Sequence, residues 1–553
     1  MAVCVAAFFV SSEALQTDIM ESRNLVTANE MVEYGNWLVP TMNGELRLEK
    51  PPFPTWVAAV IQILVPDSIG AQRAAAGTMG ALWALFLFLT VEAVTWREDT
   101  AGLSTIIFLT CYSVVLMGRT ATWDIYCHAF MQGAVWLLFR IFYTDPCERR
   151  RRHIWMFLVA GLLMGLSFLS KGPVSFFALL LPFMIACAFY GRPDTRFSGP
   201  GVTVMLVTLL VVSMWWYVYI YVFHTDLATA VLHKESGAWV SHNVRPWWYY
   251  WRYFLETGVW SLLTLAALLA PLFVRALRGQ RDFVFAVVWM LGAVVLLSLM
   301  PEKKTRYLLP VMAPSAMSVG IFLMYVYDEW NEFRAGRIIY RVNGWLVTVI
   351  TGCLAVGVLY LWLGMGAVNA WVAIVSFLLL AADAVWMGIC TRQGFVVHFV
   401  DAVAVLFIVA ECLLMTQVTS FFNNPASRPI SRIRTDWRVE GLRLFRITDN
   451  GVRMELVLGA GHRIRPIPTA KADTVLMLMP CAVLTKQPVS HILSARTLEK
   501  IDTVYIGTFD DNRHARTNSH YNPELVNRVT IIRPKIRFWP DIIEWPEDRI
   551  MPR

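Results

Sequence analysis

Apolar residues run in long stretches along this chain, and short polar turns separate the stretches. After residue 70 the stretches lie at about 71–96, 101–117, 123–143, 154–170, 173–190, 202–223, 254–275, 283–300, 307–327, 344–364, 369–390 and 396–416. A bilayer-crossing helix needs roughly 20 apolar residues, and residues 1–16 supply the outer part of one more. The pattern predicts an all-α polytopic membrane protein with about thirteen transmembrane helices.

The first long polar interruption, residues 17–56, has the pattern of a folded outer loop. Residues 22–34 predict a surface helix that Ser22 caps and Gly35 ends. Prolines and an Asn-Gly pair then predict turns. Residues 53–66 are apolar but too short to span, which favours a re-entrant or interfacial helix.

The end of the chain has the composition of a soluble domain. Strand-like runs lie at 441–447, 453–458, 474–479, 502–508 and 526–532, and a helix is predicted near 490–500. We therefore expect a transmembrane domain over 1–419 and a small C-terminal α/β soluble domain over 420–553.

Composition and charge support the membrane assignment. The chain is 57% hydrophobic and only 16% charged, against about 25% charged in soluble domains. Basic residues gather in short loops at 149–152, 275–281 and 334–341, so the net charge of +8 orients helices and does not indicate nucleic-acid binding. The positive-inside rule makes that side cytoplasmic and places the first loop and the tail outside.

Cations also lie at span ends on the outer side, against that rule. They are Lys50, Lys171, Arg245, Lys303, Lys304 and Arg306. Such a cluster suits a phosphate-bearing lipid headgroup. Carboxylates on the same side, Asp18, Glu21, Glu49 and Asp124, suit a general base toward an acceptor hydroxyl.

Each of these features has a plainer alternative. Arg119 and Asp124 are compatible with a structural pair, and Lys303-Lys304 with side chains that snorkel to the interface. The aromatic run Trp247–Trp251 suits a membrane-interface belt as well as sugar stacking. Asp18 is also compatible with a helix cap.

Five motifs in order resemble those of the aminoarabinose lipid A transferases, which belong with the protein O-mannosyltransferases to the glycosyltransferase C superfamily. The first is the run Glu21-Ser22-Arg23, Glu30-Met31, Gly35-Asn36-Trp37, Pro40, Asn43-Gly44, Glu49-Lys50-Pro51-Pro52 and Trp56. The others are Gly118–Asp124, Lys171-Gly172-Pro173, Pro246–Tyr250 and Lys304–Pro310. The resemblance covers roughly residues 17–327.

This resemblance implies thirteen transmembrane helices, an outer soluble tail and a polyprenyl-phosphate sugar donor. It implies that Asp124 is one catalytic carboxylate, with Glu21 and Asp18 as further candidates. Donor-phosphate contacts are expected at Lys50, Arg119, Lys303, Lys304, Arg306 and Tyr307. Sugar, acceptor or groove contacts are expected at Arg23, Arg245, Trp247 and Tyr249. Glu49 and His242 are the candidates for a divalent cation, and the identity of any cofactor is left open.

One position departs from the family pattern. Alignment through Glu21-Ser22-Arg23 places Met20 where the family usually has a catalytic aspartate. Either Glu21 or Asp18 substitutes for that acid, or the role is not needed. An already ionised phosphate acceptor would require no base.

The predicted function is transfer of a sugar, with inversion, from undecaprenyl phosphate to a lipid A-like glycolipid at the outer face of a bacterial inner membrane. One alternative is a protein O-glycosyltransferase that uses the same donor. Another is a non-catalytic or transport protein of the same fold. Transporters usually carry midplane charges, whereas these charges gather at one set of span ends.

Overall fold

The computed structural model describes residues 1–143, 149–193, 198–226, 229, 243–422, 424 and 427–535. The chain divides into two compact units. The helical unit comprises Met1–Leu15, Trp37–Pro40 and Arg47–Phe421; the α/β unit comprises Gln16–Asn36, Thr41–Leu46 and the chain from Phe422 onward. The polar loop at 17–56 is therefore shared between the two units.

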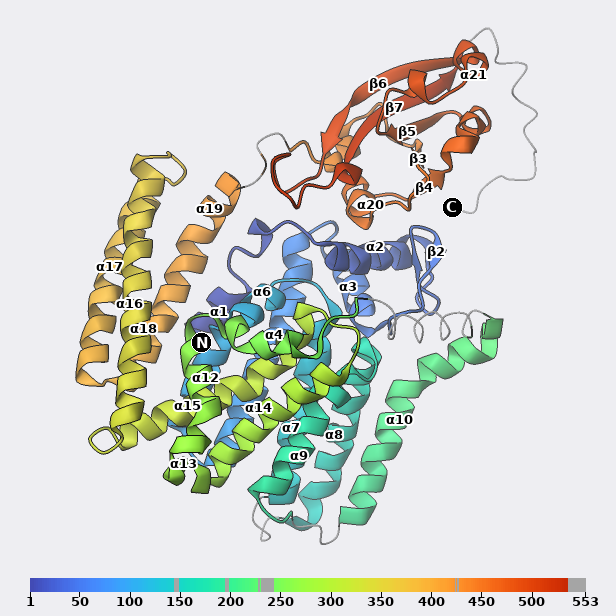
Figure 1. The fold of residues 1–553 in the computed structure, drawn as a ribbon. Helices are drawn as coiled ribbons and strands as arrows, with labels where there is room; N and C mark the ends of the chain where they lie inside the picture. Colours follow the sequence, from blue (N-terminus) through green and yellow to red (C-terminus); the bar gives the residue numbers. More distant parts are fainter. Residues whose placement is uncertain are drawn as a thin grey trace. The chain divides into compact units, whose positions relative to one another are not determined.

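The helical unit is built of helices (Figure 1). Its first part contains α1 (Ala2–Phe8), η1 (Ser12–Ala14), α3 (Phe53–Leu64), α4 (Ile69–Thr95), α5 (Glu98–Leu109), α6 (Tyr112–Gly118), α7 (Trp123–Tyr143), α8 (Arg149–Lys171), η3 (Phe176–Leu180), α9 (Leu181–Tyr190) and α10 (Ser198–Phe223). Its second part contains η4 (Trp247–Trp260), α12 (Ser261–Phe273), α13 (Arg275–Gly279), α14 (Arg281–Leu299), η5 (Thr305–Val311), α15 (Met312–Asp328), α16 (Arg334–Leu363), α17 (Ala370–Gln393), α18 (Val396–Val409), η6 (Ala410–Leu414) and α19 (Met415–Phe422).

Within the described residues, ten helices are long and apolar enough to cross a membrane, and up to twelve if two bent pairs each count as one span. The fold class is confirmed, and the chain is a multi-pass membrane protein; the count of thirteen is not confirmed. One reason is the stretch predicted at 101–117, where α5 and α6 meet at 67°. The break lies at Cys111, whose backbone is extended.

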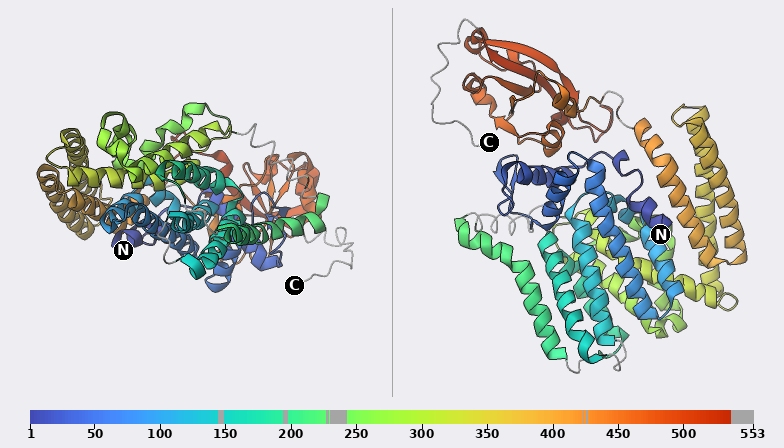
Figure 2. Two further views of the ribbon diagram at one scale, coloured as in Figure 1. Left: turned by 90° about the horizontal axis from the view of Figure 1, so that it is seen from below. Right: turned by 180° about the vertical axis from the view of Figure 1, so that it is seen from behind.

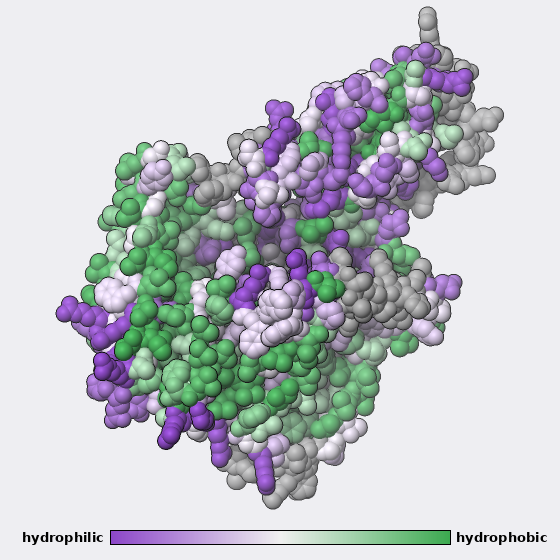
Figure 3. All heavy atoms as spheres, viewed as in Figure 1, coloured by the Kyte–Doolittle hydropathy of each residue, from purple (hydrophilic) through white to green (hydrophobic). Residues whose placement is uncertain are grey.

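Large apolar side chains on the surface of the helical unit indicate where lipid contacts it. Figure 3 shows this surface as broadly hydrophobic. On α10 the exposed residues include Val207, Leu210, Val211 and Val218. The helices α16, α17 and α18 stand side by side, as Figures 1 and 2 both show, and α16 likewise exposes valines and isoleucines.

The α/β unit contains a five-stranded sheet of order β4-β3-β5-β7-β6. Its strands are β3 (Arg443–Ile447), β4 (Ile464–Ile467), β5 (Cys481–Thr485), β6 (Ile501–Asp510) and β7 (Val526–Pro534). Strands β4, β3 and β5 are parallel, and β7 is antiparallel to both of its neighbours. Apolar clusters cover both faces of the sheet, as parallel strands require.

Helical elements surround this sheet. They are α2 (Ile19–Tyr34), η7 (Ile430–Thr435), α20 (Met454–Ala460), η8 (Thr469–Met477), η9 (Val489–His491), α21 (Ala495–Lys500) and η10 (Pro523–Leu525). A two-stranded ribbon, β1 (Thr41–Met42) with β2 (Glu45–Leu46), completes the unit. Val26 of α2 shares a buried cluster with Leu456 of α20 and Leu444 of β3, so part of the first loop belongs to this hydrophobic core.

Several element predictions were wrong in the α/β unit. The run 453–458 is helix α20, which buries Leu456, Val457 and Ala460 on one face and ends at Gly461 with φ +78°. The run 474–479 lies mostly in η8. Strands β4 and β5 were missed because β4 places exposed Arg465 and Pro466 together between two buried isoleucines, and β5 is a short run buried throughout.

The helix predicted at 22–34 begins earlier, at Ile19. Its cap is Asp18 and not Ser22, because the Asp18 carboxylate accepts hydrogen bonds from the backbone N–H groups of Met20 and Glu21, at 2.9 and 2.7 Å. Such a cap satisfies two of the free donors at a helix start. Gly35 ends the helix as predicted, with φ +70°.

Candidate active site

A buried ion pair joins two of the sequence motifs in the helical unit. Asp124 lies in the first turn of α7 and Lys171 is the last residue of α8, two helices that pack together. The Lys171 ammonium donates to the Asp124 carboxylate. Both side chains are more than nine-tenths buried, so the pair sits at helix ends away from water, where an unpaired charge would be costly.

Cations surround the ring of Tyr307, the first tyrosine after the predicted basic turn. The Lys171 Nζ lies 5.0 Å from the centre of the ring, and the Lys304 Nζ and the Arg306 Cζ each lie 5.8 Å from it. The charge of Arg306 also acts on the Asp124 carboxylate. The structure therefore brings Asp124, Lys171, Lys304, Arg306 and Tyr307 into one cluster, which we call the cation cluster.

Arg306 offers a donor toward an additional group. Its Nε is buried and has no hydrogen-bond partner among the described residues. Lys304, by contrast, pairs with Glu302 at 2.5 Å. Unsatisfied buried donors are rare in proteins and are costly. An anionic ligand at Arg306 would supply the hydrogen-bond acceptor that its Nε lacks.

The aromatic motif after residue 246 packs against the turn that carries the cation cluster. The Tyr250 hydroxyl accepts from the backbone N–H of Lys304 at 2.9 Å. Arg252 donates to the hydroxyls of Tyr249 and Thr305, at 3.1 and 2.8 Å. Tyr250 is fully buried. The segment after residue 246 therefore holds Lys304 and Thr305 at the end of this turn.

The end of the first loop is anchored beside the ion pair. The Arg47 guanidinium stacks on the ring of Trp123, with 4.8 Å between the Cζ and the centre of the ring. Leu48 shares a buried cluster with Leu169 and Trp216. Trp123 directly precedes Asp124, and Leu169 lies two residues before Lys171. Lys50 and Glu49 follow within two residues of these anchors and are half-buried.

Arg119 occupies a different environment from the cation cluster. Its Nε donates to the carbonyl of Ala7 at 2.7 Å, another nitrogen donates to the carbonyl of Ala6, and a third pairs with Glu411 at 2.6 Å. The guanidinium thus ties α6 to α1 and η6. Contact with a donor phosphate stays a prediction for this residue.

The other predicted groove residues differ in exposure. Lys303 is buried and its ammonium donates to the carbonyl of Met300. Arg245 lies over the ring of Tyr249, with 5.9 Å between its Cζ and the centre of the ring. Trp247 exposes 62% of its surface, which leaves its ring available to lipid or sugar.

Three predicted residues lie on or beside α2, in the α/β unit. Asp18 is the cap of that helix and Glu21 is fully buried in its first turn. Arg23 follows two residues later. Their catalytic or acceptor-binding roles stay predictions.

A metal site is not formed by the described residues, among which no three His, Cys, Asp or Glu side chains gather in a suitable geometry. His242, predicted as a ligand together with Glu49, lies outside the described residues. The pairing of Glu49 with His242 around a cation therefore stays a prediction.

Sequence reasoning overlooked the roles of two residues in this site. Lys171 was part of the predicted outer cluster but had no assigned role, although its KGP motif marks a helix end. Arg47 was not considered, and nothing in the sequence indicated that it would stack on Trp123. Only the packing of α7 against α8 and of the loop end against both shows these contacts.

Comparison with known proteins supports the resemblance. The family model described as dolichyl-phosphate-mannose-protein mannosyltransferase matches residues 10–229. The undecaprenyl phosphate-alpha-4-amino-4-deoxy-L-arabinose arabinosyl transferase of Shewanella sediminis is 29% identical over 354 residues, 60% of this chain and 61% of that protein. A protein of the same description from Pseudomonas fluorescens is 25% identical over 367 residues, 62% of this chain and 59% of that protein.

Among solved structures, ArnT from Cupriavidus metallidurans bound to undecaprenyl phosphate matches with a TM-score of 0.66 and 16% identity, over 96% of each chain. Its apo form matches with the same TM-score. The chain therefore has an ArnT-like fold and resembles the aminoarabinose transferase branch. Its sequence alignment spans about 60% of the length of the curated relatives.

Proposed function

We propose that this chain is an integral-membrane glycosyltransferase that moves a sugar from an undecaprenyl-phosphate donor to a lipid A-like glycolipid. The observation that carries the proposal is the cation cluster, in which Lys171, Lys304 and Arg306 surround Tyr307 beside the Asp124 carboxylate. The names of the relatives, which act with undecaprenyl phosphate-linked aminoarabinose, supply the donor class.

The chemistry proposed is an inverting displacement. An acceptor oxygen attacks the anomeric carbon, and the bond between that carbon and the donor phosphate oxygen breaks. Negative charge grows on the departing undecaprenyl phosphate, and Lys50, Lys171, Lys304 and Arg306 stabilise it. The Tyr307 hydroxyl donates a hydrogen bond to the same group.

Asp124 orients the acceptor and takes its proton when the acceptor is a hydroxyl. An ionised phosphate acceptor carries no such proton, which accounts for Met20 at the position where the family usually has an aspartate. Arg119, which donates to two carbonyls of α1 and pairs with Glu411, holds α1 in this proposal. A divalent cation at Glu49 and His242 would screen the phosphate further.

The proposed location is the inner membrane of a bacterium, with the site and residues 420–553 on the periplasmic side. The support is the excess of arginine at 149–152, 275–281 and 334–341, which the positive-inside rule assigns to the cytoplasm.

Transfer from a labelled undecaprenyl-phosphate sugar to purified lipid A in membranes tests the proposal. We expect Asp124→Asn and Lys50→Ala to lower turnover about 100- to 1,000-fold. Arg516→Gln, an exposed arginine in the α/β unit, is the control and should retain wild-type turnover. Wild-type turnover in both site variants would refute these roles, and a wild-type protein inactive on every acceptor would favour a non-catalytic or transport protein.

A second candidate function is transfer to protein from the same donor. It is favoured by the family model at residues 10–229, whose description names protein as the acceptor. A serine- and threonine-containing peptide acceptor in the same assay separates the two functions. Labelled peptide without labelled lipid would replace the first proposal.

A further inference from the structure

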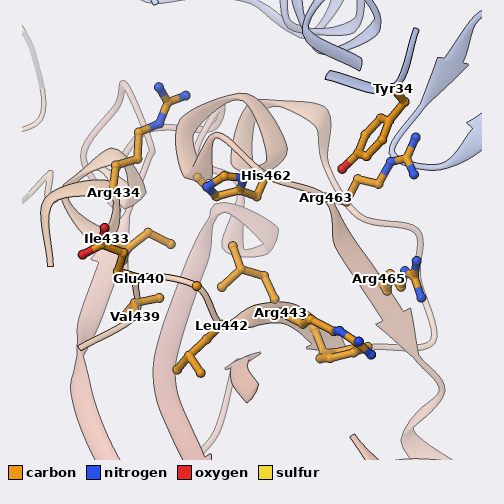
Figure 4. Close-up of a pocket in the computed structure, with 14 residues that line it drawn as sticks. Tyr34, Ile433, Arg434, Val439, Glu440, Leu442, Arg443, His462, Arg463 and Arg465 are labelled. Atoms are coloured by element: carbon orange, nitrogen blue, oxygen red, sulfur yellow. The ribbon is translucent and has the colours of Figure 1, made fainter. Parts of the chain in front are cut away.

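The α/β unit contains a basic pocket that the proposed transfer chemistry does not use. It has a volume of about 420 Å³ and lies where β3 and β4 begin. Four arginines line it, Arg434, Arg443, Arg463 and Arg465, together with His462. Figure 4 shows Arg443, Arg463 and Arg465 on one side of this pocket, with Arg434 and Glu440 on the other. We call it the arginine pocket.

Three of these arginines lie where the parallel strands β3 and β4 begin. Phe445 of β3 is opposite Arg465 of β4 in the parallel ladder. Arg443 is the first residue of β3, and Arg463 directly precedes β4. Because the two strands are parallel, both begin at the same edge of the sheet, and the three guanidinium groups gather near that edge.

Carboxylates offset only part of this charge. Glu30 of α2 pairs with Arg463 at 2.8 Å, and this hydrogen bond raises the pKa of Arg463. Glu440 is the one acid that lines the pocket in the described chain. Arg443 and Arg465 are exposed, and no ion pair is formed by either with a described residue. The pocket therefore keeps a net positive charge.

Arg463 is held in place on two sides. Its guanidinium lies 3.7 Å from the centre of the Tyr34 ring, and burial is the main cause that raises the pKa of Tyr34 to about 12. Tyr34 therefore stays uncharged at neutral pH and stacks on Arg463 without neutralising it. A fixed arginine beside two exposed ones is suited to a ligand with more than one anionic oxygen.

We propose that the arginine pocket binds the phosphate-bearing headgroup of an anionic glycolipid. Arginine forks match the oxygens of a phosphate monoester, and half-buried Leu442 in the lining supplies apolar contact for a sugar ring. The identity of that glycolipid as the acceptor rests on the proposed function. The arginine pocket then selects acceptors by their phosphates, whereas the cation cluster binds the donor.

Equilibrium binding to the full-length protein in nanodiscs of zwitterionic lipid tests the pocket. Undecaprenyl phosphate first fills the donor site. A labelled glucosamine disaccharide with two phosphates, its dephosphorylated form and inorganic pyrophosphate are then titrated. We expect Arg443→Gln with Arg465→Gln to raise the Kd of the phosphorylated disaccharide about ten- to a hundredfold, and added salt to weaken wild-type binding.

The control is Lys471→Gln with Arg496→Gln, which removes the same charge from exposed positions on η8 and α21. It should change the Kd less than twofold, and unfolding temperatures of both variants should match the wild type. Equal losses in both variants, or equal affinity for the dephosphorylated disaccharide, would overturn the proposal. Pyrophosphate that binds as tightly as the phosphorylated disaccharide would show that the pocket binds free phosphate. That result would overturn the proposal of a glycolipid headgroup.

This experiment separates the pocket from the transfer reaction. Binding needs no turnover, so selective binding by the Asp124→Asn variant supports the pocket even if no transfer is found. Conversely, normal transfer to lipid A with no pocket-dependent binding would refute the pocket and leave the proposed function standing.

Discussion

At the scale of single residues, the ion pair between Lys171 and Asp124 combines stability with chemistry. Both groups are buried, and breaking a buried pair by removing one partner leaves the other charge without compensation. The same lysine lies against the ring of Tyr307. The pair therefore connects the carboxylate that faces the acceptor with the cations that face the donor in the proposed mechanism.

We expect Lys171→Met to lower stability by about 3–5 kcal/mol, because Asp124 is then buried and unpaired. The double variant Lys171→Met with Asp124→Asn should recover much of that loss, since it leaves no buried charge. Thermal unfolding in detergent measures both. A double variant no more stable than Lys171→Met alone would mean that the pair contributes little as an ion pair.

A second single residue, Asp511, makes the α/β unit sensitive to pH. One of its oxygens accepts from the backbone N–H of Ile430 at 3.0 Å, and the other is buried without a partner among the described residues. Burial raises the pKa of this carboxyl to about 7. The folded state thus holds a proton that the unfolded state releases near pH 4.

Stability of the α/β unit should therefore fall as pH rises from about 4 to 7, by an amount on the order of a few kcal/mol. Asp511→Asn keeps an acceptor for Ile430 and carries no charge, so its stability should not fall over that range. Hydrogen exchange of the sheet amides at several pH values measures the difference. Parallel pH profiles for wild type and variant would contradict the assignment.

At the scale of elements, part of the first loop is bound into the α/β unit by hydrogen bonds to an edge strand. The Asn43 amide donates to the carbonyl of Ile464 and its oxygen accepts from the Ile464 N–H, both at 2.8 Å. Glu30 adds the ion pair with Arg463 and accepts from the N–H of Gly44 at 3.1 Å. These contacts join α2 and the β1–β2 ribbon to β4.

We expect Asn43→Ala to destabilise this join by about 1–3 kcal/mol, because the Ile464 backbone loses two partners. Protection of the β4 amides against hydrogen exchange should fall, whereas that of β6, on the opposite edge of the sheet, should not. Thr474→Ala, an exposed position on η8, is the control. Equal loss of protection in β4 and β6 would indicate global unfolding and contradict a local join.

At the scale of the whole molecule, the distribution of charge predicts which ends of the helices face the cytoplasm. The loop at Arg278 and the tail at Arg516 should lie on opposite sides. In intact cells, a membrane-impermeant maleimide should label Arg516→Cys above the wild-type background and leave Arg278→Cys at background. Labelling of Arg278→Cys in intact cells would reverse the orientation.

Much of the fold followed from the pattern of apolar residues. A run of about 20 apolar residues must form a helix in a bilayer, since no water is present to satisfy the backbone. Short elements were harder to predict. The strand β4 contains exposed Arg465 and Pro466. It is a strand because it pairs with β3, and the local sequence pattern does not show that pairing.

The sequence by itself determined that this is a multi-pass membrane protein with an α/β tail, and its ordered motifs indicated the transferase branch that the comparisons support. Those properties depend on composition and on local order along the chain. Only the tertiary structure decided that Lys171 pairs with Asp124, that Arg119 ties α1 to α6, and that part of the first loop joins the sheet of the tail. Such contacts depend on the angles and registers at which distant segments pack, and these are set by side-chain complementarity across the whole core.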